Sequence, residues 1–197
     1  VEVNGTDVKA YPEGELIQKI GIVPQKAVLF EGTIRDNLKW GNEHASDEML
    51  WEALDTAQAR ELAEGKEGQL DVRIEQNGRN LSGGQKQRLT IARALVKQPE
   101  ILILDDSASA LDFATDLRLR QAIHGLEGDM TVFIVSQRTS SVRGADVILV
   151  LDDGRLVGKG THEELLRQCE VYQEIYYSQF PEERPADKKS GNSVPGE

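Results

Sequence analysis

Cysteine is scarce in this sequence, and long apolar runs are missing. Cys169 is the only cysteine, which excludes an internal disulfide and agrees with a reducing compartment. The longest apolar runs are ILIL at 101–104 and VILVL at 147–151, whereas a membrane-spanning helix needs roughly 18 to 20 consecutive apolar residues. No signal peptide is recognisable either. We therefore expect the chain to work in the cytosol.

Positive charge is also scarce. The sequence has 23 Lys and Arg against 34 Asp and Glu, a net charge of -11. Because binding to phosphate backbones depends on clustered Lys and Arg, this balance argues against general nucleic-acid binding. Backbone amides and a few cations can still hold a nucleotide at one site.

Three short runs rich in Ile, Val and Leu predict buried strands of a mostly parallel sheet, at 101–104, 132–135 and 147–151. Residues 111–126 between the first two have a helical pattern, with Leu117, Gln121 and His124 on one face. This strand, helix and strand order predicts an α/β fold.

Residues 31–98 lack a convincing strand run and predict an inserted helical subdomain. Ser46 is a suitable N-cap there, followed by one apolar face made of Leu50, Ala53, Leu54 and Ala57.

The remaining boundaries follow from composition and capping signals. Thr161 and Glu164 form a capping box, so we expect one helix over 161–180, and the Pro-rich, charged residues 181–197 predict a disordered tail. Residues 1–30 and 99–160 would form the α/β core. The chain opens on Val1 inside a regular pattern, so we expect it to be cut from a longer polypeptide.

The first motif is LSGGQKQR at 81–88, directly before a helical pattern. Ser82 and Gln85 form a plausible capping pair, so an ordinary helix start is the simpler interpretation. A helix start also presents free amide donors and the positive end of a dipole, and Gly83 and Gly84 let a phosphate approach the backbone.

The second motif is ILILDDSASALD at 101–112. A buried strand that ends in Asp105 places a carboxylate at the C-terminal edge of the sheet, where α/β folds bind ligands and where an acid can hold Mg²⁺ through water.

LSGGQKQR followed by ILILDDSASALD resembles the signature motif, Walker B strand and D-loop of ABC ATPases. IVPQ at 22–25 is similar to the Q-loop, and LFEGTIRDNLKWG at 29–41 to the segment after that loop in ABC exporters. VSQR at 135–138 lies at the switch position, and DDGRLVGKGTHEELL at 152–166 resembles the end of the domain. The resemblance covers nearly the whole chain and implies a P-loop NTPase-like core that binds ATP and Mg²⁺.

The resemblance implies a role for each matching residue. Gln25 would sense Mg²⁺ or the attacking water and couple to the membrane domain, and Asp105 would hold Mg²⁺. Because these domains work as head-to-tail dimers, the ATP of a second nucleotide-binding domain would be bound by Ser82, Gly83, Gly84 and Gln85. Residues 109–112 would be the D-loop that crosses the interface, with Asp112 among the nucleotide contacts.

Two positions depart from the family pattern, which has Glu after the Walker B Asp and His at the switch. This chain has Asp106 and Gln137 there. Asp reaches less far than Glu, and Gln can donate a hydrogen bond to phosphate but cannot carry the charge of a protonated imidazole. We expect the three histidines, His44, His124 and His162, to be structural or solvated and to offer no replacement.

The signature motif is intact while the chain's own hydrolytic positions, Asp106 and Gln137, are altered. The chain therefore resembles the half of a heterodimeric exporter with a degenerate site, and it would complete a hydrolysing site on its partner. Multidrug or lipid export is the commonest activity for that resemblance. A regulatory module that binds ATP without hydrolysis, and a soluble ABC-type ATPase, remain as alternatives.

No P-loop of the form G-x-x-x-x-G-K-[ST] occurs in the sequence. That loop supplies the amides and the Lys that hold the phosphates. We therefore expect these 197 residues by themselves to bind ATP weakly or not at all.

Overall fold

The computed structural model describes residues 1–126 and 128–185. They belong to two compact units, Val1–Ser136 and Gln137–Glu197. Within the described ranges, no helix has the length and apolar character that crossing a membrane requires.

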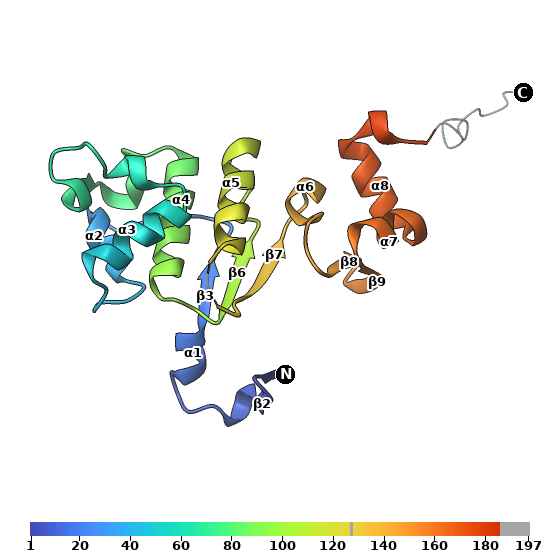
Figure 1. Cartoon of the computed structure of the whole chain (residues 1–197), viewed down its shortest axis with the longest axis horizontal. Helices are drawn as coiled ribbons and strands as arrows, with labels where there is room; N and C mark the ends of the chain where they lie inside the picture. The colour runs from blue at the N-terminus through green and yellow to red at the C-terminus, as the bar shows by residue number, and fades with distance from the viewer. Residues whose placement is uncertain (127, 186–197) are drawn as a thin grey trace, which may run out of the picture. The chain divides into compact units, whose positions relative to one another are not determined.

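The first unit contains a parallel sheet. Its strands β3 (Ile20–Val23), β6 (Ile101–Asp105) and β7 (Thr131–Val135) run side by side in the order β3-β6-β7 (Figure 1). Both pairings are parallel, and the two predicted strands at 101–104 and 132–135 are present. The α/β fold with a parallel core is confirmed.

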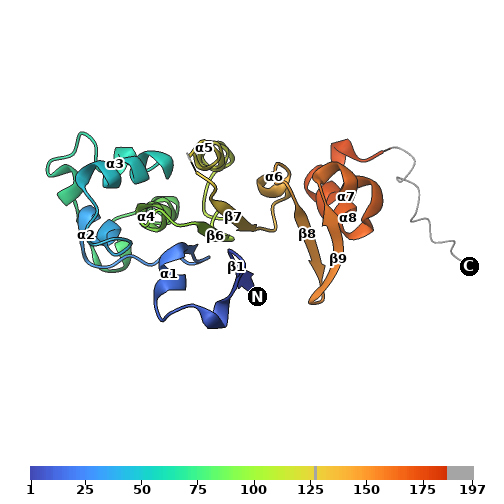
Figure 2. The ribbon, with the colours of Figure 1, turned by 60° about the horizontal axis from the view of Figure 1, so that its bottom comes forward.

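Helices α4 (Gly83–Val96) and α5 (Phe113–His124) lie on the same side of this sheet (Figure 2). The predicted helix is present as α5, where Leu117 is 38% exposed and Leu119 and Ile123 are buried. Leu119 and Ile123 lie four residues apart on one face and join the core cluster of the sheet, so they determine which side of α5 packs inward.

Only one face of the sheet is covered by these helices. Val23 and Leu102 are fully buried, whereas Ile22 is 60% and Phe133 53% exposed. The prediction that the strands are buried is therefore correct for one face and wrong for the other. Both helices pack on the same side, so the alternate side chains of each strand face away from them.

Helices dominate residues 31–98, but two short strands also form there. β4 (Gly32–Thr33) pairs antiparallel with β5 (Arg73–Ile74), contrary to the expectation of no strand. The predicted apolar face of the first long helix is confirmed, with Leu50, Ala53, Leu54 and Ala57 all at most 5% exposed. The other elements of the unit are β1 (Glu2–Val3), β2 (Thr6–Asp7), η1 (Val8–Ala10), α1 (Glu15–Lys19), α2 (Ile34–Lys39), α3 (Asp47–Thr56), η2 (Arg60–Leu62), η3 (Gln69–Asp71) and η4 (Gln76–Gly78).

The second unit pairs a β-hairpin with two helices. Strand β8 (Ile148–Asp152) was expected in the parallel sheet, but it pairs antiparallel with β9 (Arg155–Gly160) in a separate two-stranded sheet. The two-residue connection Asp153 and Gly154 has left-handed φ values of 45° and 73°, which is the geometry of a tight hairpin turn. This turn chemistry decides the pairing of β8.

The single helix expected over 161–180 is two helices, α7 (His162–Gln168) and α8 (Glu170–Gln179). The Thr161 and Glu164 capping box is present at the start of α7. Cys169 breaks the helix with an extended backbone, and its thiol packs so closely on β9 that a Cβ at Gly158 would lie 2.7 Å from Sγ. Packing on the hairpin therefore overrides the helical pattern.

Two further elements complete this unit, α6 (Thr139–Val142) and η5 (Pro181–Glu183). The tail predicted over 181–197 begins with η5, and its part over 186–197 lies outside the described residues.

An ion-pair network ties the helical part together. Arg35 on α2 pairs with Asp47 at the start of α3 and, at 2.8 Å, with Asp71 in η3. The hydrogen bond from Arg35 lowers the pKa of Asp71. A carboxyl group with a depressed pKa stabilises the fold above its unfolded pKa, about 3.9, and loses that contribution as the pH falls through the folded pKa.

We predict that Arg35→Ala lowers the free energy of unfolding at pH 7 and makes its decline below about pH 4 shallower. Urea unfolding between pH 3 and pH 7 measures both effects. Arg73→Ala is the matched control, because Arg73 is 77% exposed in its pair with Glu31, and such pairs contribute up to about 1 kcal/mol. Equal losses in the two variants would contradict the prediction.

Candidate functional site

The N-terminus of α4 carries the signature motif. The Ser82 hydroxyl accepts a hydrogen bond from the Gln85 amide at 3.3 Å, and the Gln85 side chain accepts one from the Ser82 amide at 2.8 Å. The predicted capping box is therefore present. It leaves the amides of Gly83 and Gly84 without a hydrogen bond to any described residue, and they point from the positive end of a helix.

The two glycines of this motif have different surroundings. A Cβ added at Gly84 would come within 3.1 Å of the Ala110 carbonyl oxygen, so Gly84 allows α4 to pack against Ala110 and Leu111. A Cβ added at Gly83 would meet no atom within 4 Å. Glycine in a helix costs roughly 0.5 to 1 kcal/mol relative to Ala, and no described residue requires it at position 83.

Gln25, Asp105 and Asp106 meet at one edge of the parallel sheet. Gln25 lies two residues after β3, Asp105 ends β6, and Asp106 follows directly. The Gln25 side chain donates a hydrogen bond to the Asp106 carboxylate at 3.1 Å. The structure thus brings together three residues that the sequence assigned to one site.

Asp106 has a left-handed backbone, with φ at 44°. Its amide donates to the Val135 carbonyl at the end of β7 at 2.8 Å. The Ser109 hydroxyl donates to the Asp106 carbonyl at 2.8 Å, and the Ser109 amide at 3.1 Å. Left-handed non-glycine residues cost about 1 kcal/mol or more and persist where surrounding contacts hold them, often at functional sites.

The donors at this edge suit a magnesium ion that is shared with a ligand. Asp105 and Asp106 supply carboxylate oxygens, and Gln25 supplies an amide oxygen. In the described part of the chain, no three His, Cys, Asp or Glu side chains gather as a metal site. Mg²⁺ is usually held by one or two carboxylates together with phosphate oxygens and waters, so this set fits Mg²⁺ only alongside phosphate.

Asp112 is engaged within its own helix. Its carboxylate accepts hydrogen bonds from the Thr115 amide at 2.9 Å and the Thr115 hydroxyl at 2.8 Å, as the N-cap of α5. The backbone hydrogen bond, followed by the side-chain one, lowers the pKa of Asp112. The structure therefore shows a helix cap at a residue that the sequence assigned to nucleotide contact.

Gln137 opens the second unit, two residues after β7, and is exposed. Its carbonyl accepts a hydrogen bond from the Gln179 side chain at 2.8 Å.

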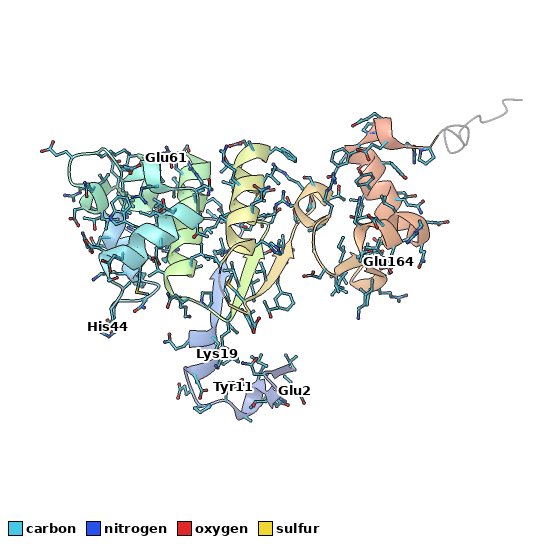
Figure 3. All side chains as sticks on the ribbon, viewed as in Figure 1. Glu2, Tyr11, Lys19, His44, Glu61 and Glu164 are labelled. Carbon is cyan, nitrogen blue, oxygen red and sulfur yellow. The ribbon has the colours of Figure 1, made fainter. Side chains whose placement is uncertain are left out.

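The histidines have ordinary environments. His44 projects from the surface of the first unit (Figure 3), and His124 is exposed at the end of α5. His162 Nδ1 lies 2.9 Å from the Tyr172 hydroxyl, and burial, followed by the charge of Arg143, lowers its pKa.

An aromatic surface near the Q-loop was missed by the sequence analysis. Phe30 and Trp40 stack with ring centroids 4.5 Å apart, and Trp40 remains 68% exposed. The Arg93 guanidinium lies 5.7 Å from the Phe30 centroid and fixes the Val28 carbonyl by a hydrogen bond. An open groove of about 810 Å³ beside Trp40 is lined by Lys39, His44 and Lys97, among others. We call Phe30 and Trp40 the aromatic platform.

The chain is similar in sequence to known proteins. The family model described as ABC transporter matches residues 1–109. An ABC transporter ATP-binding protein of Bacillus subtilis is 44% identical over 183 residues, 93% of this chain and 32% of that protein. A beta-(1→2)glucan export ATP-binding/permease protein of Rhodopseudomonas palustris is 40% identical over 180 residues, 91% of this chain and 30% of that protein.

A solved structure is similar in both fold and sequence. The structure of a bacterial Atm1-family ABC exporter with ATP bound matches with a TM-score of 0.84 and 36% identity, over 89% of this chain and 31% of that chain. The chain thus spans about a third of the length of the relatives it matches. Because the family model covers more than half of its residues, the chain belongs to the ABC transporter family, within the ATPase domain of that family.

Proposed function

We propose that the chain is the ATP-binding and hydrolysing part of an ABC membrane exporter, at the cytoplasmic face of the membrane. It powers transport by ATP-driven pairing with a second nucleotide-binding domain. The observation that carries this proposal is the N-terminus of α4, where two amides have no partner among the described residues and Gly83 faces open space.

These α4 groups suit a phosphate brought by another molecule. The capping box already stabilises the helix start, so the Gly83 and Gly84 amides are available to an anion. Ser82, Gly83, Gly84 and Gln85 would bind the γ-phosphate of the partner's ATP. The relatives named as exporters support a membrane protein over a soluble ABC-type ATPase.

The chain's own half-site is built on Gln25, Asp105 and Asp106. Asp105 would hold Mg²⁺ together with the phosphates of ATP, with Gln25 beside it. Bound Mg²⁺ neutralises charge on the phosphates and orients them. Asp106 would orient a water. Its carboxylate accepts a hydrogen bond from Gln25, and its backbone is left-handed.

Asp106 and Gln137 support a degenerate site on this chain and therefore a heterodimer. Asp106 stands where the family pattern has Glu, and Gln137 where it has His. A water-activating carboxylate needs a heavy-atom distance of about 2.6 to 3.2 Å, so a shorter side chain weakens that role. The same two residues favour a regulatory, non-hydrolysing module as the second candidate function. Multidrug export stays a prediction from the resemblance.

The aromatic platform is the surface that would meet the membrane domain. Phe30 and Trp40 present stacked rings at 41% and 68% exposure, next to the groove. Exposed aromatic side chains beside a groove commonly mark protein interfaces. A cytoplasmic loop of the membrane domain would lie in this groove and against Trp40.

We predict that Gly83→Ala raises the free energy of unfolding by about 0.5 kcal/mol, because Ala is the better helix former and its methyl has space. It lowers ATP hydrolysis by the intact transporter at least about tenfold, because the methyl occupies the approach of the phosphate. Chemical unfolding and phosphate release measure the two effects. Gly144→Ala is the control, since Gly144 also faces open space without a left-handed φ. Wild-type hydrolysis by Gly83→Ala would refute the assignment of the signature motif.

We predict that Asp106→Asn leaves the turnover of the assembled pair within about threefold of wild type, whereas removing the partner's Walker B Glu lowers it about 100-fold. The reason is that hydrolysis occurs at the partner's site. Steady-state ATPase assays of the pair test this. If Asp106→Asn abolished turnover as fully as loss of the partner's Glu, the degenerate-site proposal would be wrong. Turnover that is absent with and without a partner would favour the regulatory module.

We predict that a thiol placed by Trp40→Cys reacts with a maleimide at least about tenfold more slowly in the intact transporter than a thiol placed by Glu48→Cys, because the membrane domain covers the platform. Both positions are exposed in this chain, and the native Cys169 is buried. Equal labelling rates at the two positions would show that the membrane domain does not cover the aromatic platform.

A further inference from the structure

The side chain of Gln179, the last residue of α8, reaches back to the switch segment. Its Nε2 donates to the Gln137 carbonyl at 2.8 Å. Its Oε1 accepts from the Thr139 amide at 3.0 Å and from the Thr139 hydroxyl at 3.1 Å. One amide group therefore holds the backbone on both sides of Arg138, from a position 40 residues further along the chain.

The Gln179 side chain acts as the N-terminal cap of α6. Thr139 begins α6, and Arg138, at the N-cap position, makes no side-chain capping hydrogen bond. Oε1 of Gln179 supplies the acceptor that the Thr139 amide would otherwise lack. Thr139 is 3% exposed, so an amide left without an acceptor there would be costly.

The end of α8 is itself fixed. Tyr176 is 2% exposed, its hydroxyl donates to the Glu183 carboxylate, and its ring packs against Phe180 with centroids 5.0 Å apart. Gln179 lies between these two aromatic residues in sequence, so its side chain starts from a rigid point. The three hydrogen bonds therefore join the switch segment to a part of α8 whose aromatic neighbours are packed.

We propose that Gln179 is a positioning residue for the switch residue Gln137. It fixes the peptide groups next to Gln137 and so determines the direction in which the exposed Gln137 side chain meets the γ-phosphate. The inference rests on the proposed function, in which this chain's own site retains ATP. In this role Gln179 does not touch the nucleotide, and it acts through its hydrogen bonds to Gln137 and Thr139.

The test is the preference for ATP over ADP at this chain's own site, because Gln137 would contact only the γ-phosphate that ADP lacks. In the intact transporter, radiolabelled 8-azido-ATP is photo-crosslinked to this chain, and unlabelled ATP or ADP competes. Gln179→Leu is expected to lower the ATP preference about tenfold through weaker ATP binding, with ADP binding unchanged. Gln168→Leu makes the same chemical change at an exposed position on α7 and should leave the preference at the wild-type value.

A second variant separates positioning from simple helix capping. Gln179→Glu keeps the acceptor for Thr139 but loses the donor to the Gln137 carbonyl, and its carboxylate repels that oxygen. It is expected to lower the ATP preference as Gln179→Leu does, while its thermal unfolding midpoint stays closer to wild type. In a Gln137→Ala background, neither substitution should lower the preference further.

The outcomes distinguish this inference from the function on which it rests. A wild-type preference in Gln179→Glu would mean that Gln179 only caps α6, and additive losses in the Gln137→Ala background would mean a general structural role. Either result overturns the inference alone. A wild-type transporter without ATP binding to this chain would overturn the proposed function as well.

Discussion

The candidate site depends on the parallel register of β6 with its two neighbours. Val23 pairs with Leu104 and Asp105 with Val135, so all three strands end at one edge of the sheet. This edge brings the Gln25 side chain to 3.1 Å from the Asp106 carboxylate, across 81 residues of sequence. A shift of one residue would turn the side chains of β6 to opposite faces, and both the core contacts of Leu102 and the Gln25 contact would be lost.

Asp at position 106 has two opposing consequences. Asp adopts left-handed backbone conformations more readily than most residues because its short polar side chain forms local hydrogen bonds. It therefore suits the φ of 44° that Val135 and Ser109 impose. The same short side chain reaches less far toward a water than Glu. Asp at position 106 therefore suits this backbone conformation and shortens the reach of the carboxylate.

Features that depend on neighbouring residues could be predicted from the sequence. The capping boxes at Ser82 and Thr161 and the apolar face of α3 need only contacts three or four residues apart, and all are present. The apolar run of β8 by itself accepts either a parallel or a hairpin partner, and only the Asp153 and Gly154 turn that follows it indicates the antiparallel pairing. The contact of Gln179 with Gln137 gives no sequence signal, since it joins a side-chain amide to a backbone carbonyl 42 residues away.

The two glycines of the signature motif differ in whether contacts within the chain explain them. Gly84 is explained within the chain, because a Cβ there would press on the Ala110 carbonyl at 3.1 Å. Gly83 is not, because a Cβ there would meet nothing within 4 Å and Ala would make the better helix. Local choices that reduce stability without a gain inside the fold are expected at functional sites. No described residue accounts for the bare backbone at Gly83, and a helix start whose amides have no partner among the described residues favours an anion.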